Sequence, residues 1–227
     1  MDRRWRITNS NAREMGVPML TAHVLSFLSL TIQIQGETDT AEKFLRESLT
    51  LTQKIGYRWG IGHALDGLGI LAQTRDPREA RDLFAASSDV YREIGDLQSL
   101  ARALSHQGFA SLALEDLPDA QKSFTEALDL ARQSDYLPFV LDALSGFASL
   151  YAKRGIMEQA LELALIVLNH PAILQETKDR TENLRAEAEA RLTQSKINAI
   201  QTQAGELTLE SIMENPLTQV GRKFTSR

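Results

Sequence analysis

The chain of 227 residues carries a net charge of −5, with 43% apolar and 24% charged residues. This composition is ordinary for a folded protein of one or two domains, and the negative charge disfavours nucleic acid and anionic membranes as main partners. The chain contains no cysteine, which excludes disulfides, thiolate nucleophiles and cysteine-ligated zinc and fits the cytoplasmic location that we predict. No window reaches the roughly 18 apolar residues that cross a bilayer, so we expect no membrane-spanning helix.

Four stretches of the sequence repeat with a period of about 40 residues, and they define three sets of equivalent positions. The alanine column consists of Ala41, Ala80, Ala120 and Ala160. The aromatic column lies one helical turn later and consists of Leu45, Phe84, Phe124 and Ala164. The small column stands upstream of the alanine column in each repeat and consists of Ser29, Gly69, Gly108 and Ala148.

Each repeat contains two apolar stretches at helical spacing, and a short polar turn joins them. In one of these turns Asp76 is a predicted N-cap, Pro77 stands at the first helical position and Glu79 follows in the first turn. A small residue on the first helix lets the second helix pack closely. Because no single pair can bury its apolar face alone, neighbouring pairs must stack. We therefore predict an all-α fold, a solenoid of antiparallel helix pairs.

In chain order, residues 1–16 are predicted to be the second helix of an incomplete preceding repeat, because the register places Trp5 on the aromatic column. A divergent cap helix is the alternative. An uncapped end predicts a longer parent protein, and also self-association through this N-terminal end. Residues 17–170 are predicted to form four helix pairs and residues 171–214 capping helices with a strongly charged first helix. Residues 215–227, with three basic and no acidic side chains, are expected to be a disordered tail.

The columns resemble the consensus of the tetratricopeptide repeat family, which has small residues at its eighth and twenty-seventh positions, alanine at its twentieth and an aromatic residue at its twenty-fourth. The period, which is longer than that of the usual repeat, is similar to the MalT-like variety. The resemblance implies a right-handed superhelical solenoid. Proline at each repeat end and tryptophan at the fourth position are the family features that this sequence lacks. The matching residues are Gly69, Ala80, Phe84, Gly108, Ala120, Phe124 and Ala127.

The segment 170–180, together with Leu207, Thr208, Leu209 and Glu210, resembles the extreme C-terminus of large bacterial signalling proteins. In these proteins a tetratricopeptide region follows a regulatory ATPase. The resemblance implies a sensor or partner-binding arm of a signal-transduction ATPase or transcriptional regulator. A free-standing adaptor or peptide receptor is the alternative hypothesis, and an enzyme on a helical scaffold is the third.

In this family, ligands bind the concave surface formed by the first helices, so the resemblance implies a protein or peptide as partner. At the positions where one subclass clamps a terminal carboxylate with Lys and Asn, this sequence has Ser26, Asp66, Ser105 and Ser145. That activity is therefore not implied. The candidate groove residues are His23, Ser26, Gln33, His63, Asp66, Gln73, Arg102, Ser105, His106, Phe109, Asp142 and Ser145.

No pattern of residues predicts catalysis, a metal site or a cofactor. The glycine-rich segment 60–69 resembles a phosphate-binding loop, but it has neither a preceding strand nor a Gly-Lys-Ser/Thr sequence, so we interpret its glycines as helix-packing positions. His23 and His63 share a repeat position, yet zinc needs about four converging ligands, and the spacing supplies no such set. We interpret these histidines as polar lining of the groove.

Overall fold

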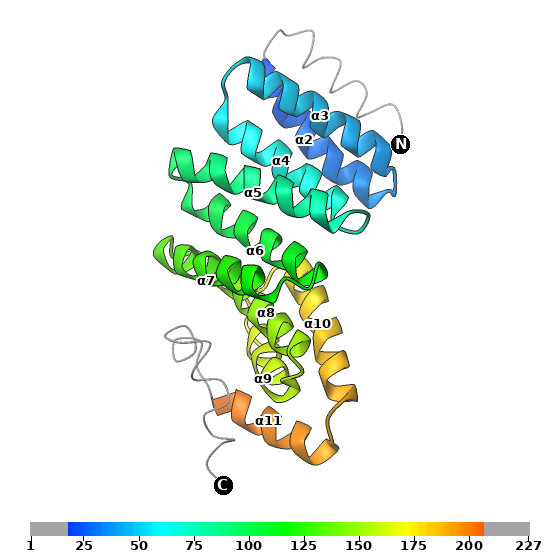
Figure 1. Ribbon diagram of the computed structural model, residues 1–227, viewed down its shortest axis with the longest axis vertical. Coiled ribbons are helices and arrows are strands. Elements are labelled where there is room, and N and C mark those ends of the chain that lie inside the picture. Colours follow the sequence, from blue (N-terminus) through cyan, green and yellow to red (C-terminus); the bar gives the residue numbers. More distant parts are fainter. Residues whose placement is uncertain (1–17, 207–227) are drawn as a thin grey trace. The chain divides into compact units, whose positions relative to one another are not determined.

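The computed structural model describes residues 18–206, and every regular element in that part of the chain is an α-helix (Figure 1). The all-α fold class is therefore confirmed for these residues. The helices are α2 (Pro18–Ile34), α3 (Thr38–Lys54), α4 (Arg58–Ala72), α5 (Pro77–Ile94), α6 (Leu97–Ala113), α7 (Leu117–Gln133), α8 (Leu137–Lys153), α9 (Met157–Leu168), α10 (Gln175–Ala190) and α11 (Gln194–Glu206).

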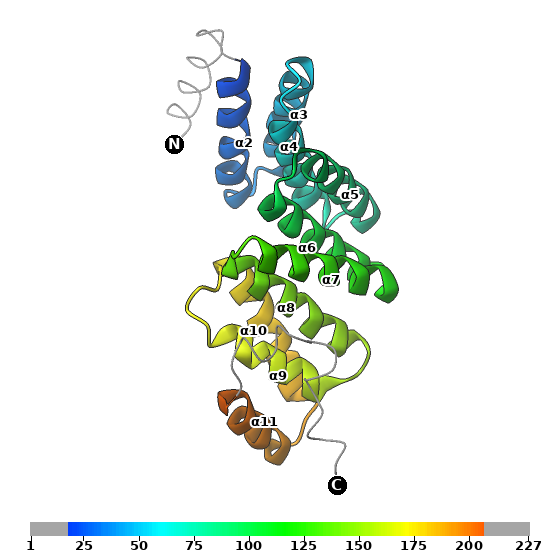
Figure 2. The same ribbon diagram turned by 90° about the vertical axis from the view of Figure 1, so that its left-hand side faces the viewer.

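The helices belong to two compact units, one ending at Leu114 and the other beginning at Glu115. In the first unit α3 packs between α2 and α4, and α5 packs between α4 and α6 (Figures 1 and 2). In the second unit α8 packs on α7 and α9, α10 packs on α8 and α9, and α11 packs on α9. Helices that are neighbours in the sequence are thus mostly neighbours in space within each unit.

The predicted helix start at Asp76 is confirmed. Its Oδ1 accepts hydrogen bonds from the backbone N–H groups of Arg78, at 3.0 Å, and Glu79, at 3.2 Å. These bonds satisfy two of the donors that the first turn of α5 leaves unpaired, and Pro77 has no N–H that needs a partner. The other end of α5 closes at Gly95, whose φ of 71° is a left-handed conformation that glycine adopts without strain.

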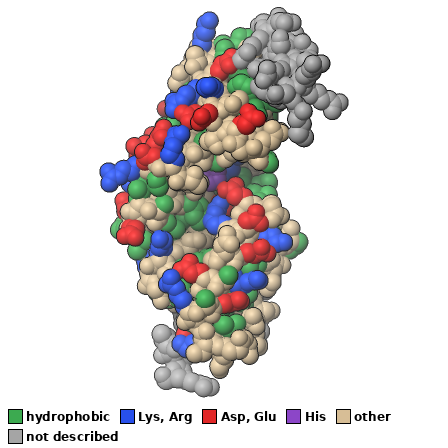
Figure 3. Space-filling view, turned by 90° about the vertical axis from the view of Figure 1, so that its right-hand side faces the viewer, with side chains coloured by type: hydrophobic (Ala, Val, Ile, Leu, Met, Phe, Trp, Pro, Cys, Tyr) green, Lys and Arg blue, Asp and Glu red, His purple; other side chains and the backbone are tan. Residues whose placement is uncertain are grey.

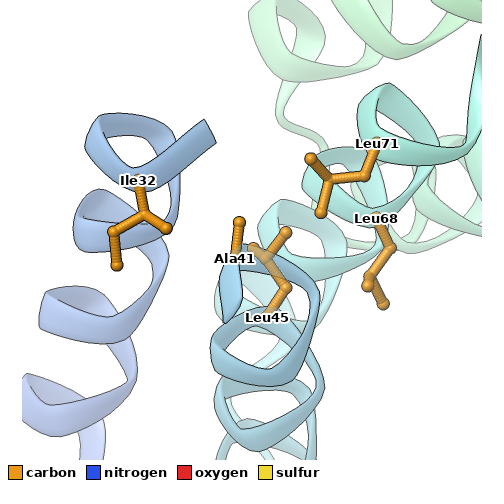
Figure 4. Packing of buried hydrophobic residues seen from close by; sticks show 5 residues of the cluster. All are labelled: Ile32, Ala41, Leu45, Leu68 and Leu71. Carbon is orange, nitrogen blue, oxygen red and sulfur yellow. The ribbon is translucent and has the colours of Figure 1, made fainter. Parts of the chain in front are cut away.

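The repeat columns form the core of each unit. Figure 4 shows Ala41 and Leu45 of α3 lying between Ile32 of α2 and the pair Leu68 and Leu71 of α4. All five of these side chains are buried. The small side chain of Ala41 allows the neighbouring helices to approach closely, and the leucines fill the remaining space between them.

The small column lets the two helices of a repeat approach each other. A Cβ placed on Gly69 of α4 would lie 2.5 Å from the ring of Phe84 on α5, which is closer than any side chain tolerates. The close approach that the sequence predicts at the small column is thus confirmed for this pair, and the side chain that meets Gly69 belongs to the aromatic column. Within segment 60–69, Gly62 and Gly67 likewise face the side chains of Tyr91 and Leu45, so these glycines are packing positions inside α4.

Two predicted segments and part of a third lie outside the described residues. These are residues 1–16, the tail 215–227, and the end of 171–214 beyond Glu206. The predicted charged helix at the start of 171–214 is α10, and a second helix, α11, follows it.

Candidate functional site

Polar and aromatic side chains line one side of the first helices in the first unit. We call this set the first-helix strip; it consists of His23, Tyr57, Trp59, His63 and Arg102. His23 lies on α2, Tyr57 immediately precedes α4, Trp59 and His63 lie on α4, and Arg102 lies on α6. All five side chains are partly exposed, so a partner can reach them.

The rings of the strip contact one another. Trp59 stacks on His63 with ring centroids 5.0 Å apart, because residues four apart lie on the same side of a helix. His23 meets Trp59 edge-on at 5.5 Å and Tyr57 edge-on at 5.4 Å. Edge-to-face and offset arrangements are the favourable geometries for aromatic rings, so the cluster holds its members in place.

Arg102 is held by a buried carboxylate. Its Nη2 atom lies 3.1 Å from Oδ2 of Asp66 on α4, while Nδ1 of His106 lies 3.0 Å from Oδ1 of the same residue. Burial alone raises the pKa of Asp66, but the charges of Arg102 and His106 and the hydrogen bond to His106 outweigh it and lower that pKa to about 2. Asp66 is therefore ionised at neutral pH and fixes Arg102 at the edge of the strip.

Two further groups near this carboxylate have shifted pKa values. Burial lowers the pKa of His63, and the nearby charge of Arg102 lowers it further, so that the imidazole is neutral at pH 7. Burial and the negative charge of Asp66 raise the pKa of Tyr91 on α5. The strip thus presents the neutral ring of His63 beside the fixed positive charge of Arg102.

The ring nitrogens of the strip include two unpaired atoms. Nε2 of His23 and Nδ1 of His63 are buried and have no hydrogen-bond partner among the described residues. An unpaired buried polar atom costs about 1–3 kcal/mol.

The structure corrects the position of seven predicted groove residues, whose side chains are buried rather than lining an open groove. Ser26 stands three residues after His23, and Asp66 stands three residues after His63. Three residues correspond to a rotation of about 60° around the helix, and this rotation turns the side chains of Ser26 and Asp66 toward the packed side. The hydroxyl of Ser26 accordingly lies 2.9 Å from that of Ser48 on α3. The seven buried residues are Ser26, Asp66, Ser105, His106, Phe109, Asp142 and Ser145.

In the second unit, α10 covers the equivalent positions. Thr177 of α10 donates to Oδ1 of Asp142 at 2.8 Å, Nη1 of Arg180 lies 3.0 Å from the same oxygen, and the hydroxyls of Ser145 and Thr181 are 2.8 Å apart. Asp142 of α8 thus pairs with an arginine two helices further along the chain, as Asp66 of α4 pairs with Arg102 of α6 in the first unit. These side chains hold α10 and are not available to a partner.

Of the other predicted residues, Gln33 and Gln73 are partly exposed near the ends of α2 and α4, away from the strip. Tyr57 and Trp59 were not predicted as site residues. The spacing of four between Trp59 and His63 is the signal that places both on one side of α4.

Charge is mixed on the surface. On the face drawn in Figure 3, acidic and basic side chains are interspersed, and neither sign forms a continuous patch. Within residues 18–206, no group of three or more histidine, aspartate or glutamate side chains converges on a position for a metal ion. None of the described helices combines the length and apolar character needed to cross a bilayer.

Neither a protein-family model nor a curated protein sequence matches the chain. Among solved structures, the crystal structure of BtubC (BKLC) from P. vanneervenii is similar, with a TM-score of 0.70 and 16% sequence identity. The match covers 93% of this chain and 90% of that chain. At this identity the similarity concerns the fold alone.

Proposed function

We propose that this chain is a non-catalytic repeat module that binds a protein or peptide. The observation that carries the proposal is the first-helix strip, in which aromatic and imidazole rings of successive first helices contact one another and one fixed arginine lies at the edge. Aromatic and arginine side chains are enriched among the residues that contribute most of the binding free energy at protein interfaces, because they fill well-packed pockets from which water is excluded. A run of such side chains across parallel helices fits an extended peptide or one helix of a partner.

The rest of the proposal follows the sequence resemblance. The helix pairs belong to a tetratricopeptide-type, MalT-like array that follows a right-handed superhelix. The array is the sensor or partner-binding arm of a larger cytoplasmic signal-transduction ATPase or transcriptional regulator, with a free-standing adaptor as the second candidate. An immunoblot of source cells separates the two, because the arm predicts a band severalfold larger than the 25.3 kDa of this chain and the adaptor predicts a band at that size.

The test of binding is a display selection with the immobilised full chain as bait. The same selection against a Trp59→Ala variant provides the counter-screen. The proposal predicts peptides that enrich on the wild-type chain and not on the variant. Peptides that enrich equally on both would show that binding takes place away from the strip, and turnover of a substrate that depends on these residues would contradict a non-catalytic role.

A further inference from the structure

Helix α2 exposes an apolar side that no other described helix exposes. Five of the nine large apolar side chains that are exposed within residues 18–206 lie on this one helix. The exposed fraction is 59% for Phe27 and 87% for Ile34. We call this set the α2 face; its members are Met19, Leu20, Phe27, Leu30 and Ile34.

The composition of α2 is that of a covered helix. Its 17 residues include no aspartate, glutamate, lysine or arginine, although helices at a protein surface usually carry such residues on their exposed side. Single exposed apolar residues are normal, whereas a contiguous patch of them marks a surface that another element covers. The other four exposed residues form no such patch, because Ile55, Ile156 and Leu174 lie between helices and Ile94 is the last residue of α5.

The repeats show what covers this side of a first helix. The position two before the small column is Phe27 in α2, and its equivalents are Gly67 in α4, His106 in α6 and Gly146 in α8. Each of the three equivalents contacts the aromatic-column residue of the preceding second helix. A Cβ on Gly67 would lie 2.8 Å from Leu45, and the ring of His106 lies 5.0 Å from that of Phe84. A Cβ on Gly146 would overlap the ring of Phe124.

A second pair of positions shows the same relation. Leu20 of the α2 face is equivalent to Gly60, where a Cβ would lie 2.5 Å from the side chain of Thr52 on α3. Both contacts come from the preceding second helix, and they are about two helical turns apart. Phe27 and Leu20 of the α2 face therefore stand at the positions where α4 receives α3.

We propose that residues 1–16 of this chain cover the α2 face, with the side chain of Trp5 against Phe27. Trp5 stands one repeat before Leu45 in the aromatic column, and Ala12 stands one repeat before Thr52. The segment thus carries the two residues that the repeat requires opposite Phe27 and Leu20. Contact between the rings of His106 and Phe84 shows that this packing accommodates two rings as well as a ring and a glycine.

The alternative occupant is a second copy of the chain, which would cover the α2 face from outside. The two cases differ in whether Trp5 and Phe27 of the same molecule are in contact. The chain contains no cysteine, so introduced thiols report on that contact without interference.

The experiment is thiol cross-linking in the full chain carrying Trp5→Cys and Phe27→Cys. The matched control pairs Trp5→Cys with Thr50→Cys, because Thr50 is exposed on α3 and lies away from the α2 face. A segment tethered to the same chain meets positions 27 and 50 by chance, at an effective concentration in the millimolar range. The Thr50 control measures the rate of cross-linking that these chance encounters produce. Both variants are treated with a short bis-maleimide and separated on a denaturing gel, after circular dichroism has shown that each is folded.

The proposal predicts a cross-linked monomer in the Phe27 variant at a rate at least tenfold above the Thr50 control. Equal rates in the two variants would overturn it, because the segment would then have no preferred position. Cross-linked dimers in place of monomers would also overturn it and would assign the face to a second copy. A chain that keeps Trp5 gives an independent measurement if Trp5→Cys weakens docking. In a Trp59→Phe background, where Trp5 is the one remaining tryptophan, Phe27→Asp should increase the quenching of Trp5 fluorescence by acrylamide. Unchanged quenching would contradict a contact between Trp5 and Phe27.

Discussion

Replacing Asp66 by asparagine tests the electrostatic centre of the first unit. The substitution keeps the size of the side chain and removes the negative charge that holds Arg102 and His106. The pKa of Asp66 falls from 3.8 to about 2 on folding, which corresponds to about 2 kcal/mol of stability at roughly 1.4 kcal/mol per pH unit. We expect Asp66→Asn to lower the free energy of unfolding at pH 7 by about this amount.

The pH dependence gives a sharper test than the loss itself. Because folding lowers this pKa, the stabilisation is complete above the unfolded value of 3.8 and disappears as the pH falls toward 2. The difference between wild type and Asp66→Asn should therefore be largest near pH 7 and shrink toward zero at pH 2. Asp82→Asn is the matched control, because that carboxylate is 77% exposed and its removal should change stability by less than about 0.5 kcal/mol.

The assay is urea unfolding followed by far-UV circular dichroism and by tryptophan fluorescence, at pH 7 and at pH 3. Agreement between the two signals checks that a single transition describes the unfolding. A loss for Asp66→Asn no larger than that for Asp82→Asn would refute the argument, and so would an Asp66→Asn deficit that persists unchanged at low pH.

Two further predictions concern packing and protonation in the described residues. Gly146→Ala should destabilise the chain by about 1–3 kcal/mol in urea unfolding, because the new methyl group overlaps the buried ring of Phe124. Gly205→Ala, which meets no atom within 4 Å in α11, should be neutral or stabilising, and an equal loss in both variants would contradict the packing argument. Because folding lowers the pKa of His63 below 6.5, the wild type should lose thermal stability between pH 7 and pH 5. His63→Gln should lose less over this range, and the same loss in both chains would show that His63 is not the group responsible.

The helix pairs could be predicted from the sequence because their signals are local. The cap at Asp76 depends only on residues of the same turn, and the columns repeat at a spacing that a helix converts into one packed side. The close approach of the two helices at Gly69 follows from the same periodicity, because the pattern predicts a small residue where the second helix packs on the first.

The candidate site was predicted less well, because its contacts cross from one repeat to the next. The pairing of Asp66 with Arg102 and His106 joins residues on different helix pairs, which no local pattern specifies. A rotation of about 60° around the helix separates buried Asp66 from half-exposed His63, and residue type alone does not resolve a difference of that size.

The charged helix at the C-terminal end shows a similar limit. Its charge pattern predicts an exposed side, but its buried side carries threonines, which are not part of an apolar stripe. Thr177 and Thr181 bury their hydroxyls by hydrogen bonding to Asp142 and Ser145 on α8. Polar contacts of this kind depend on the partner helix and become visible only in the folded chain.

Isothermal titration calorimetry with a selected peptide tests the central claim most directly. The titrations compare the wild-type chain with Trp59→Ala and with Leu174→Ala, an exposed apolar control outside the first-helix strip. The account predicts one saturable site, at least tenfold weaker binding in Trp59→Ala and unchanged binding in Leu174→Ala. Equal affinity in all three chains would show that the strip does not bind the peptide and would contradict the account.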